Sequence, residues 1–250
     1  MEIFIYLILT AIWWVISLSV LLPFLVLLLI SETVKDKWLT FIFLKVCGPR
    51  FGPKFVPMRK QLFKLLEEHL SKRNKSVPLK MLEIGVGGGA NLQFYPENSS
   101  LTALDKTPPT LFDKNRKKFP HVNLDGIVVN YAEDMKEVPS GVFDVVVSTH
   151  VLCSVTSVDS VMKEVKRVLK PGGKFLFLEH VAFSKTQASY YIIQLFATPL
   201  WAIYFDGCFL NRNIADSIKK AGFRDVHCDH TYIPFLPLFF RPHISGIATL

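Results

Sequence analysis

The N-terminal stretch is an unbroken apolar run. Residues 3–30 contain no charged side chain, and Glu2 is the only charged side chain ahead of them. As one α-helix, about 28 residues would extend roughly 40 Å, against about 30 Å for the hydrocarbon core of a bilayer. The pattern predicts an uncleaved membrane anchor over residues 1–34, because a secretory signal needs basic residues ahead of a shorter run and a small-residue cleavage site. Pro23 leaves a kinked span and a hairpin within one leaflet both open.

The segment after the anchor is basic. Residues 35–75 hold eleven Lys and Arg against three acids, an excess equal to the net charge of +8 of the whole chain. Residues 56–71 place apolar side chains at helical spacing, which predicts an amphipathic helix that packs on a core. We interpret residues 35–75 as a juxtamembrane connector that contacts anionic head groups, with the following domain in the cytosol. An ordinary solvated face is the simpler alternative.

From residue 76 onward, short apolar runs alternate with helical segments. The predicted strands are residues 79–84, 101–104, 124–129, 142–147, 174–180 and 243–250. The predicted helices between and after them are residues 109–118, 159–169 and 211–221. This alternation is typical of right-handed βαβ crossovers, and it predicts an α/β domain over residues 76–250 with a mostly parallel sheet covered by helices on both faces.

The strongest local motif is Glu-Ile-Gly-Val-Gly-Gly-Gly-Ala-Asn at residues 83–91, which follows the first predicted strand and opens a helical stretch. Glycines in such a turn let the backbone approach a ligand closely. Gly85, Gly87 and Ala90 also satisfy the dinucleotide pattern of nicotinamide oxidoreductases. Asp105 ends the next strand 20 residues after Gly85, where a carboxylate can bind the ribose hydroxyls of either cofactor; as an isolated acid it would be a turn residue.

Three further motifs separate these alternatives. Tyr-Ala-Glu-Asp-Met (131–135), Phe-Asp-Val-Val-Val-Ser (143–148) and the run ending in Leu-Lys-Pro-Gly-Gly (164–173) follow in order. Together with the glycine motif they resemble class I S-adenosylmethionine-dependent methyltransferases over residues 79–181. The likeness narrows to the membrane-bound alkyl-thiol methyltransferases of the endoplasmic reticulum and lipid droplets on residues 91–96, 151–155, 179–181, 205–208 and 241–244.

The resemblance implies a Rossmann-like fold with a seven-stranded sheet and an S-adenosylmethionine site. The residues that it assigns to this cofactor are Glu83, Gly85, Gly87, Gly89, Asp105, Ala132, Glu133 and Ser148. Asp105 would bind the ribose, Ala132 and Glu133 the adenine, and Ser148 would border the methionine end.

This sequence departs from the family pattern in three places. Val-Gly-Gly-Gly at residues 86–89 replaces the expected Cys-Gly-Thr-Gly, and Asp-Lys-Thr-Pro at 105–108 replaces Asp-Pro-Asn-Pro. His150 lies where an aliphatic residue is expected. These changes bear on substrate preference more than on cofactor binding, because the backbone cradle is kept.

A thiol acceptor reacts as thiolate, and with a pKa near 8.5 a few per cent of it is ionised at neutral pH, so a base helps without being obligatory. The candidate bases are His150, His180 and Asp206, with His243 as a further possibility. His150 follows the fourth predicted strand, at the carboxyl edge where such sheets bind ligands. A polar loop histidine is the plainer interpretation. Cys153 is expected to be a buried, inert thiol rather than a nucleophile.

Two late apolar stretches, residues 190–205 and 232–240, are too short or too interrupted by proline to span a bilayer. We interpret them as an apolar mouth for the acceptor that faces the membrane; completion of the core is the alternative.

The predicted function is methyl transfer to small lipophilic thiols at a membrane, on the endoplasmic reticulum and lipid droplets. Expected partners are a small-molecule thiol and membrane lipids. No nucleic acid is expected, because the basic excess lies in the juxtamembrane segment, and no metal, because the four cysteines are widely spaced and form no ligand motif. A lipid or isoprenoid methyltransferase is the second hypothesis, a nicotinamide oxidoreductase a distant third. A catalytically silent membrane or lipid-droplet scaffold is the alternative of another class.

Overall fold

The computed structural model describes residues 1–250, and the chain forms two compact units. The helical unit comprises Met1–Lys54, His180–Asn213 and Thr231–His243. The sheet unit comprises Phe55–Glu179, Ile214–His230 and Ile244–Leu250. Compactness therefore groups two late segments with the N-terminus, while the division into anchor, connector and methyltransferase domain remains a prediction about function.

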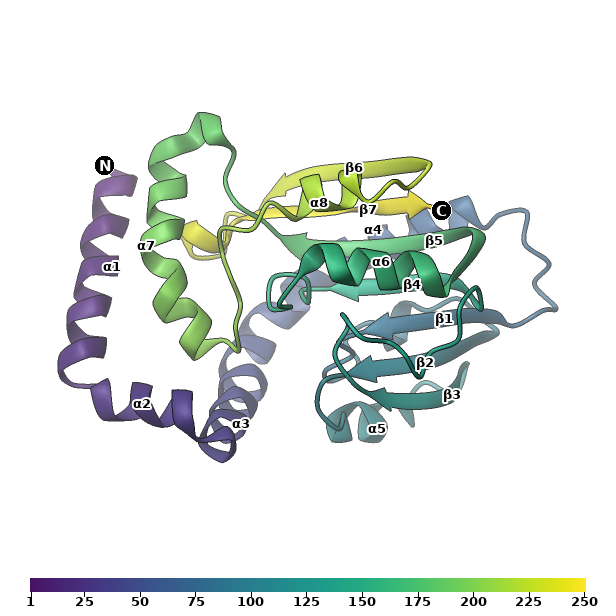
Figure 1. Ribbon diagram of the computed structural model, residues 1–250, viewed down its shortest axis with the longest axis horizontal. Coiled ribbons are helices and arrows are strands. Elements are labelled where there is room, and N and C mark those ends of the chain that lie inside the picture. Colours follow the sequence, from purple (N-terminus) through teal and green to yellow (C-terminus); the bar gives the residue numbers. More distant parts are fainter. The chain divides into compact units, whose positions relative to one another are not determined.

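The seven strands form one sheet in the order β3-β2-β1-β4-β5-β7-β6. Their bounds are β1 Leu79–Ile84, β2 Ser99–Asp105, β3 Val122–Val129, β4 Phe143–Thr149, β5 Leu169–His180, β6 Asp225–Tyr232 and β7 Pro242–Thr249. The first five pair in parallel, and β7 runs in the opposite direction (Figure 1). The predicted mostly parallel, seven-stranded α/β fold is confirmed.

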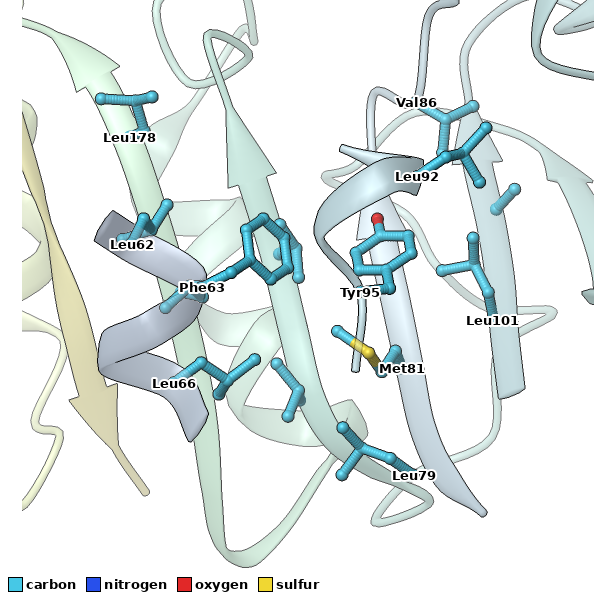
Figure 2. Packing of buried hydrophobic residues seen from close by; sticks show 14 of the residues in the cluster. Leu62, Phe63, Leu66, Leu79, Met81, Val86, Leu92, Tyr95, Leu101 and Leu178 are labelled. Carbon is cyan, nitrogen blue, oxygen red and sulfur yellow. The ribbon is translucent and has the colours of Figure 1, made fainter. Parts of the chain in front are cut away.

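The core of the sheet unit lies between the sheet and α4 (Gly48–His69). Leu62, Phe63 and Leu66 of α4 are almost fully buried and face Met81 and Tyr95 (Figure 2). Burying large apolar side chains of this kind contributes about 1.5–3 kcal/mol each. The predicted packing helix is therefore present, and it begins eight residues earlier than the apolar spacing indicated.

Three shorter helices complete the sheet unit: α5 Thr110–Arg116, α6 Val158–Val168 and α8 Ile214–Lys220. The helix expected directly after the glycine motif is replaced by turns and the single 3-10 turn η2, Leu92–Phe94. Pro96, which cannot donate a helical hydrogen bond, lies two residues after η2 ends, and the Asn91 side chain donates to Glu83 instead of capping a helix. The expectation of a helix at this point is wrong.

The helical unit contains α1 Glu2–Ser19, α2 Leu22–Ile30, α3 Glu32–Phe41, the π-helix η1 Ile42–Cys47, the 3-10 turns η3 Lys185–Gln187 and η4 Leu238–Phe240, and α7 Ala188–Tyr204. The apolar N-terminus is broken between α1 and α2, and Pro23 lies in the first turn of α2, where it breaks no helical hydrogen bond. By length and composition, α1 is the one helix that could cross a membrane, with a mean hydropathy of 1.9.

Candidate active site

The glycine motif forms a tight turn after β1. Gly85, Gly87 and Gly89 have φ of +66°, +50° and +78°, a region in which side chains with Cβ are strained. A Cβ on Gly85 would lie 2.4 Å from Cγ2 of Val151, whereas a Cβ on Gly87 would meet nothing within 4 Å. Packing against Val151 thus requires glycine at position 85, whereas Gly87 borders open space through which a ligand can approach the backbone.

Asp105 lies beside this turn at the end of β2. Its Oδ2 accepts a hydrogen bond from the Gly87 amide at 3.0 Å, and its Oδ1 accepts one from the Thr107 amide at 3.2 Å. The carboxylate is only partly buried, so it retains capacity to accept hydroxyl donors. The structure therefore brings together the two features, glycine turn and acid, that the sequence placed 20 residues apart.

Glu83 is buried behind the turn, with 1% of its surface exposed. Its Oε1 accepts from Nδ2 of Asn91 at 2.7 Å, and its Oε2 accepts from the Tyr95 hydroxyl. Burial raises the pKa of Glu83 to about 7, although both hydrogen bonds and the positive charge of Arg59 favour the ionised form. Both carboxylate oxygens thus hold the segment that follows the glycines. The direct contact of Glu83 with a cofactor stays a prediction.

Ala132 and Glu133 follow β3. The Ala132 side chain is buried, and Oε1 of Glu133 accepts from the backbone amides of Thr156 and Ser157, just before α6 begins. Glu133 therefore ties the loop after β3 to the loop after β4. The predicted adenine contact of both residues remains a prediction.

Ser148 near the end of β4 is fully buried, and its Oγ donates to Oε1 of Glu179 at 2.7 Å. Oε2 of the same carboxylate accepts from the Val151 amide at 3.0 Å. Glu179 thus holds the loop after β4, the loop that carries His150 and contacts Gly85. Glu179 belongs to the family-like segment 179–181, and the sequence signal for its role is an acid directly after the apolar run Phe-Leu-Phe-Leu.

His150 follows β4 in a left-handed conformation, φ +58°, and its amide donates to the Leu178 carbonyl at 2.9 Å. Its half-buried ring packs edge-on against Phe55 of α4, with the centroids 4.9 Å apart. The imidazole is therefore held in place at the carboxyl edge of the sheet, as a base at this edge would have to be.

The other two predicted bases belong to the helical unit and have different surroundings. His180 is 1% exposed, and its Nε2 lies 3.1 Å from Sγ of Cys208. Asp206 adopts φ +54° and lies 3.6 Å from Nζ of Lys35. Burial lowers the pKa of neighbouring His243 to about 3, so that ring is neutral at physiological pH. Of the three candidate bases, His150 lies in the sheet unit, which carries the glycine turn, and His180 and Asp206 lie in the helical unit.

The residues at the carboxyl ends of β1 and β2 fit S-adenosylmethionine. The open side of Gly87 gives a cradle that a Cβ would fill, and Asp105 adjoins it with an accessible carboxylate. Gly85, Gly87 and Asp105 would hold the nucleoside of the cofactor, which supplies an electrophilic methyl group when bound.

Comparison with known proteins also indicates a methyltransferase. Residues 82–177 match the methyltransferase domain family. The chain is 36% identical to human thiol S-methyltransferase TMT1A over 79% of this chain and 80% of that protein. It is 37% identical to thiol S-methyltransferase TMT1B of Rattus norvegicus over 78% of this chain and 79% of that protein.

Among solved structures, N-methyltransferase NodS of Bradyrhizobium japonicum WM9, in complex with S-adenosyl-L-homocysteine, has the same fold. Its TM-score is 0.52 at 14% identity, over 76% of this chain and 86% of that chain. The glycine motif is thus not that of a nicotinamide oxidoreductase. The chain belongs to the TMT1A and TMT1B family of S-adenosylmethionine-dependent methyltransferases.

Proposed function

We propose that this protein methylates small lipophilic thiols at a membrane surface, on the endoplasmic reticulum and lipid droplets, with the sheet unit in the cytosol. The observation that carries the acceptor class is the similarity to thiol S-methyltransferases over four-fifths of the chain. The turn at Gly85 and Gly87 with Asp105 supplies the donor site that this reaction needs.

The role proposed for the chain is to align donor and acceptor and to exclude water, because the donor is already activated. His150 is proposed to accept the thiol proton as the thiolate forms. Its ring is fixed against Phe55, and its backbone is fixed by the Leu178 carbonyl, so it does not need to be ordered when the acceptor arrives.

The membrane location is proposed from the helical unit. α1 exposes large apolar side chains to solvent, among them Phe4, Ile8, Ile12 and Val15. Lys35, Lys37, Lys45, Arg50 and Lys54 follow on α3, η1 and α4 before the sheet unit begins. An exposed apolar surface followed by a basic segment is what binding to an anionic membrane surface requires.

The proposal is tested with purified full-length protein in detergent and S-adenosylmethionine labelled in the methyl group. The acceptors are an alkyl-thiol series of increasing partition into lipid, hydrosulfide, phenols, amines and membrane lipids. We expect label on thiols, increasing with lipophilicity, and at least a hundredfold loss in Asp105→Ala, because one carboxylate that binds two hydroxyls is removed. Label on lipids alone would instead establish a lipid methyltransferase, and absence of donor binding would indicate a scaffold.

His150→Ala is expected to lower kcat about tenfold or more at pH 7, with an unchanged affinity for S-adenosylmethionine. The loss should shrink at pH 9, where the acceptor thiol ionises without help. His150→Gln is the matched control, because it keeps a polar side chain of similar reach and lacks a basic nitrogen. An unchanged kcat in both variants would remove His150 from the mechanism.

A further inference from the structure

α7 carries an apolar stripe on its outer face. Ile192, Leu195 and Phe196 are 44%, 43% and 59% exposed, and their spacing places them on one side of the helix. All 17 residues of α7 are uncharged. An exposed stripe of this kind on a charge-free helix is not needed for packing, since the opposite face of α7 already fills the core of the helical unit.

The rotation of α7 about its axis is fixed by that opposite face. Gln194 is fully buried, and its side chain accepts from the Phe183 amide at 2.8 Å and donates to the Phe239 carbonyl at 2.9 Å and to the Val181 carbonyl at 3.1 Å. Turning the stripe inward would break all three hydrogen bonds and leave a buried amide unpaired, which is costly. The stripe is therefore a permanent surface of the helical unit.

The stripe borders α1. The indole nitrogen of Trp14 donates to the carbonyl of Phe196 at 2.8 Å, and Ser17 lies 3.2 Å from the hydroxyl of Tyr204 at the far end of α7. At the start of α1, Glu2 pairs with Nη1 of Arg241 at 2.6 Å. α1 is thus joined to the helical unit along its whole length, and the apolar surface of α1 adjoins that of α7 at Phe196.

The chain segments before and after α7 are hydrogen-bonded to each other. The Ala182 amide, before the helix, donates to the Arg212 carbonyl, after it, at 2.9 Å. The return segment carries Asp206, which lies 3.6 Å from Nζ of Lys35. Paired ends and a charged return segment are incompatible with a crossing of the bilayer, but they allow a helix that lies within one leaflet.

The composition of α7 selects lipid over protein as the partner. The rim of a protein interface usually carries charged side chains, and α7 has none. Its half-buried aromatic residues Tyr190, Tyr191 and Trp201 lie towards its two ends, and aromatic residues of this kind favour the membrane interface.

We propose that α7 is a second membrane-inserted element, which places Ile192, Leu195 and Phe196 among the acyl chains of the leaflet that α1 enters. The inference rests on the proposed membrane location and extends it from the N-terminus to a helix that begins eight residues after β5 ends. The protein then binds the membrane through two helices, so loss of apolar character in either one weakens binding.

The test uses the full-length protein reconstituted in vesicles of phosphatidylcholine with phosphatidylserine. Benzoylphenylalanine replaces Phe196, Val15 of α1, or Val77, an exposed apolar residue of the sheet unit, in separate samples. After irradiation we expect lipid adducts at positions 15 and 196, each about fivefold or more above position 77. Adducts at 15 alone would overturn the α7 proposal and leave the membrane location standing. Absence of lipid adducts at all three positions would overturn both, and adducts of position 196 with protein would show a protein interface instead.

A second measurement uses acidic substitutions. Phe196→Glu is expected to lower the fraction of protein that floats with these vesicles about tenfold relative to Val77→Glu. The circular dichroism spectra and the thermal unfolding midpoints of the two variants should be equal, which shows that both are folded. Equal flotation of the two variants would contradict the inference.

Discussion

Gly85→Ala is expected to destabilise the sheet unit by about 3 kcal/mol and to abolish donor binding. A residue with Cβ at φ +66° costs about 1 kcal/mol, and a Cβ placed 2.4 Å from Cγ2 of Val151 adds an overpacking cost of about 2 kcal/mol. The clash pushes the turn away from the loop that Glu179 holds, so the cradle loses its shape as well as its stability.

The matched control is Gly87→Ala. Gly87 also has a positive φ, +50°, but its Cβ would meet nothing within 4 Å, so only the strain of about 1 kcal/mol applies. The new methyl group would lie where the cofactor is proposed to approach. Gly87→Ala is therefore expected to weaken donor binding strongly while most of the stability is kept.

Hydrogen exchange of peptides that cover β1 and β4 measures the stability, and calorimetric titration with S-adenosylmethionine measures the affinity. The double variant Gly85→Ala, Val151→Ala removes both Cγ atoms of Val151 and should recover most of the steric loss. An equal loss of stability in Gly85→Ala and Gly87→Ala would show that packing against Val151 does not fix this turn.

The glycine turn and its neighbour Asp105 could be predicted from the sequence because their signals are local. The glycine motif directly follows a strand, and Asp105 ends the next one, so the parallel pairing of β1 and β2 brings them together. Glu83 with Tyr95, and Ser148 with Glu179, are contacts between residues 12 and 31 positions apart, and no periodicity encodes them.

The strands also divide into those that a local pattern predicted and those that it did not. β1 lies where the apolar run predicted it, because a central parallel strand is buried on both faces. β6, Asp225–Tyr232, was not predicted, since it is the edge strand and most of its side chains are polar and exposed. β5 begins five residues early, because the sheet accommodates Pro171, Gly172 and Gly173 through a register shift against β4 instead of ending there.

The stability of the sheet unit is expected to fall as pH rises from about 5 to 7, through Glu83. Its folded pKa is about 7 and its ordinary value is 4.5, so between these values the folded state holds a proton that the unfolded state has released. The free energy of unfolding therefore decreases across this window, by about 3 kcal/mol in all, and levels off above pH 7. Below pH 4.5 both states are protonated and this contribution is fully present.

Glu83→Gln isolates the effect, because an amide of nearly the same shape is neutral at every pH. The variant is expected to equal the wild type within about 1 kcal/mol at pH 5 and to exceed it by about 2–3 kcal/mol at pH 8, measured by hydrogen exchange of β1 peptides. The difference between the two proteins is the quantity to plot, since His243, with its pKa lowered to about 3, gives the opposite slope below pH 6.5 in both. A difference that does not change with pH would mean that Glu83 is ionised in the folded protein throughout, and that the hydrogen bonds from Asn91 and Tyr95 with the charge of Arg59 outweigh its burial.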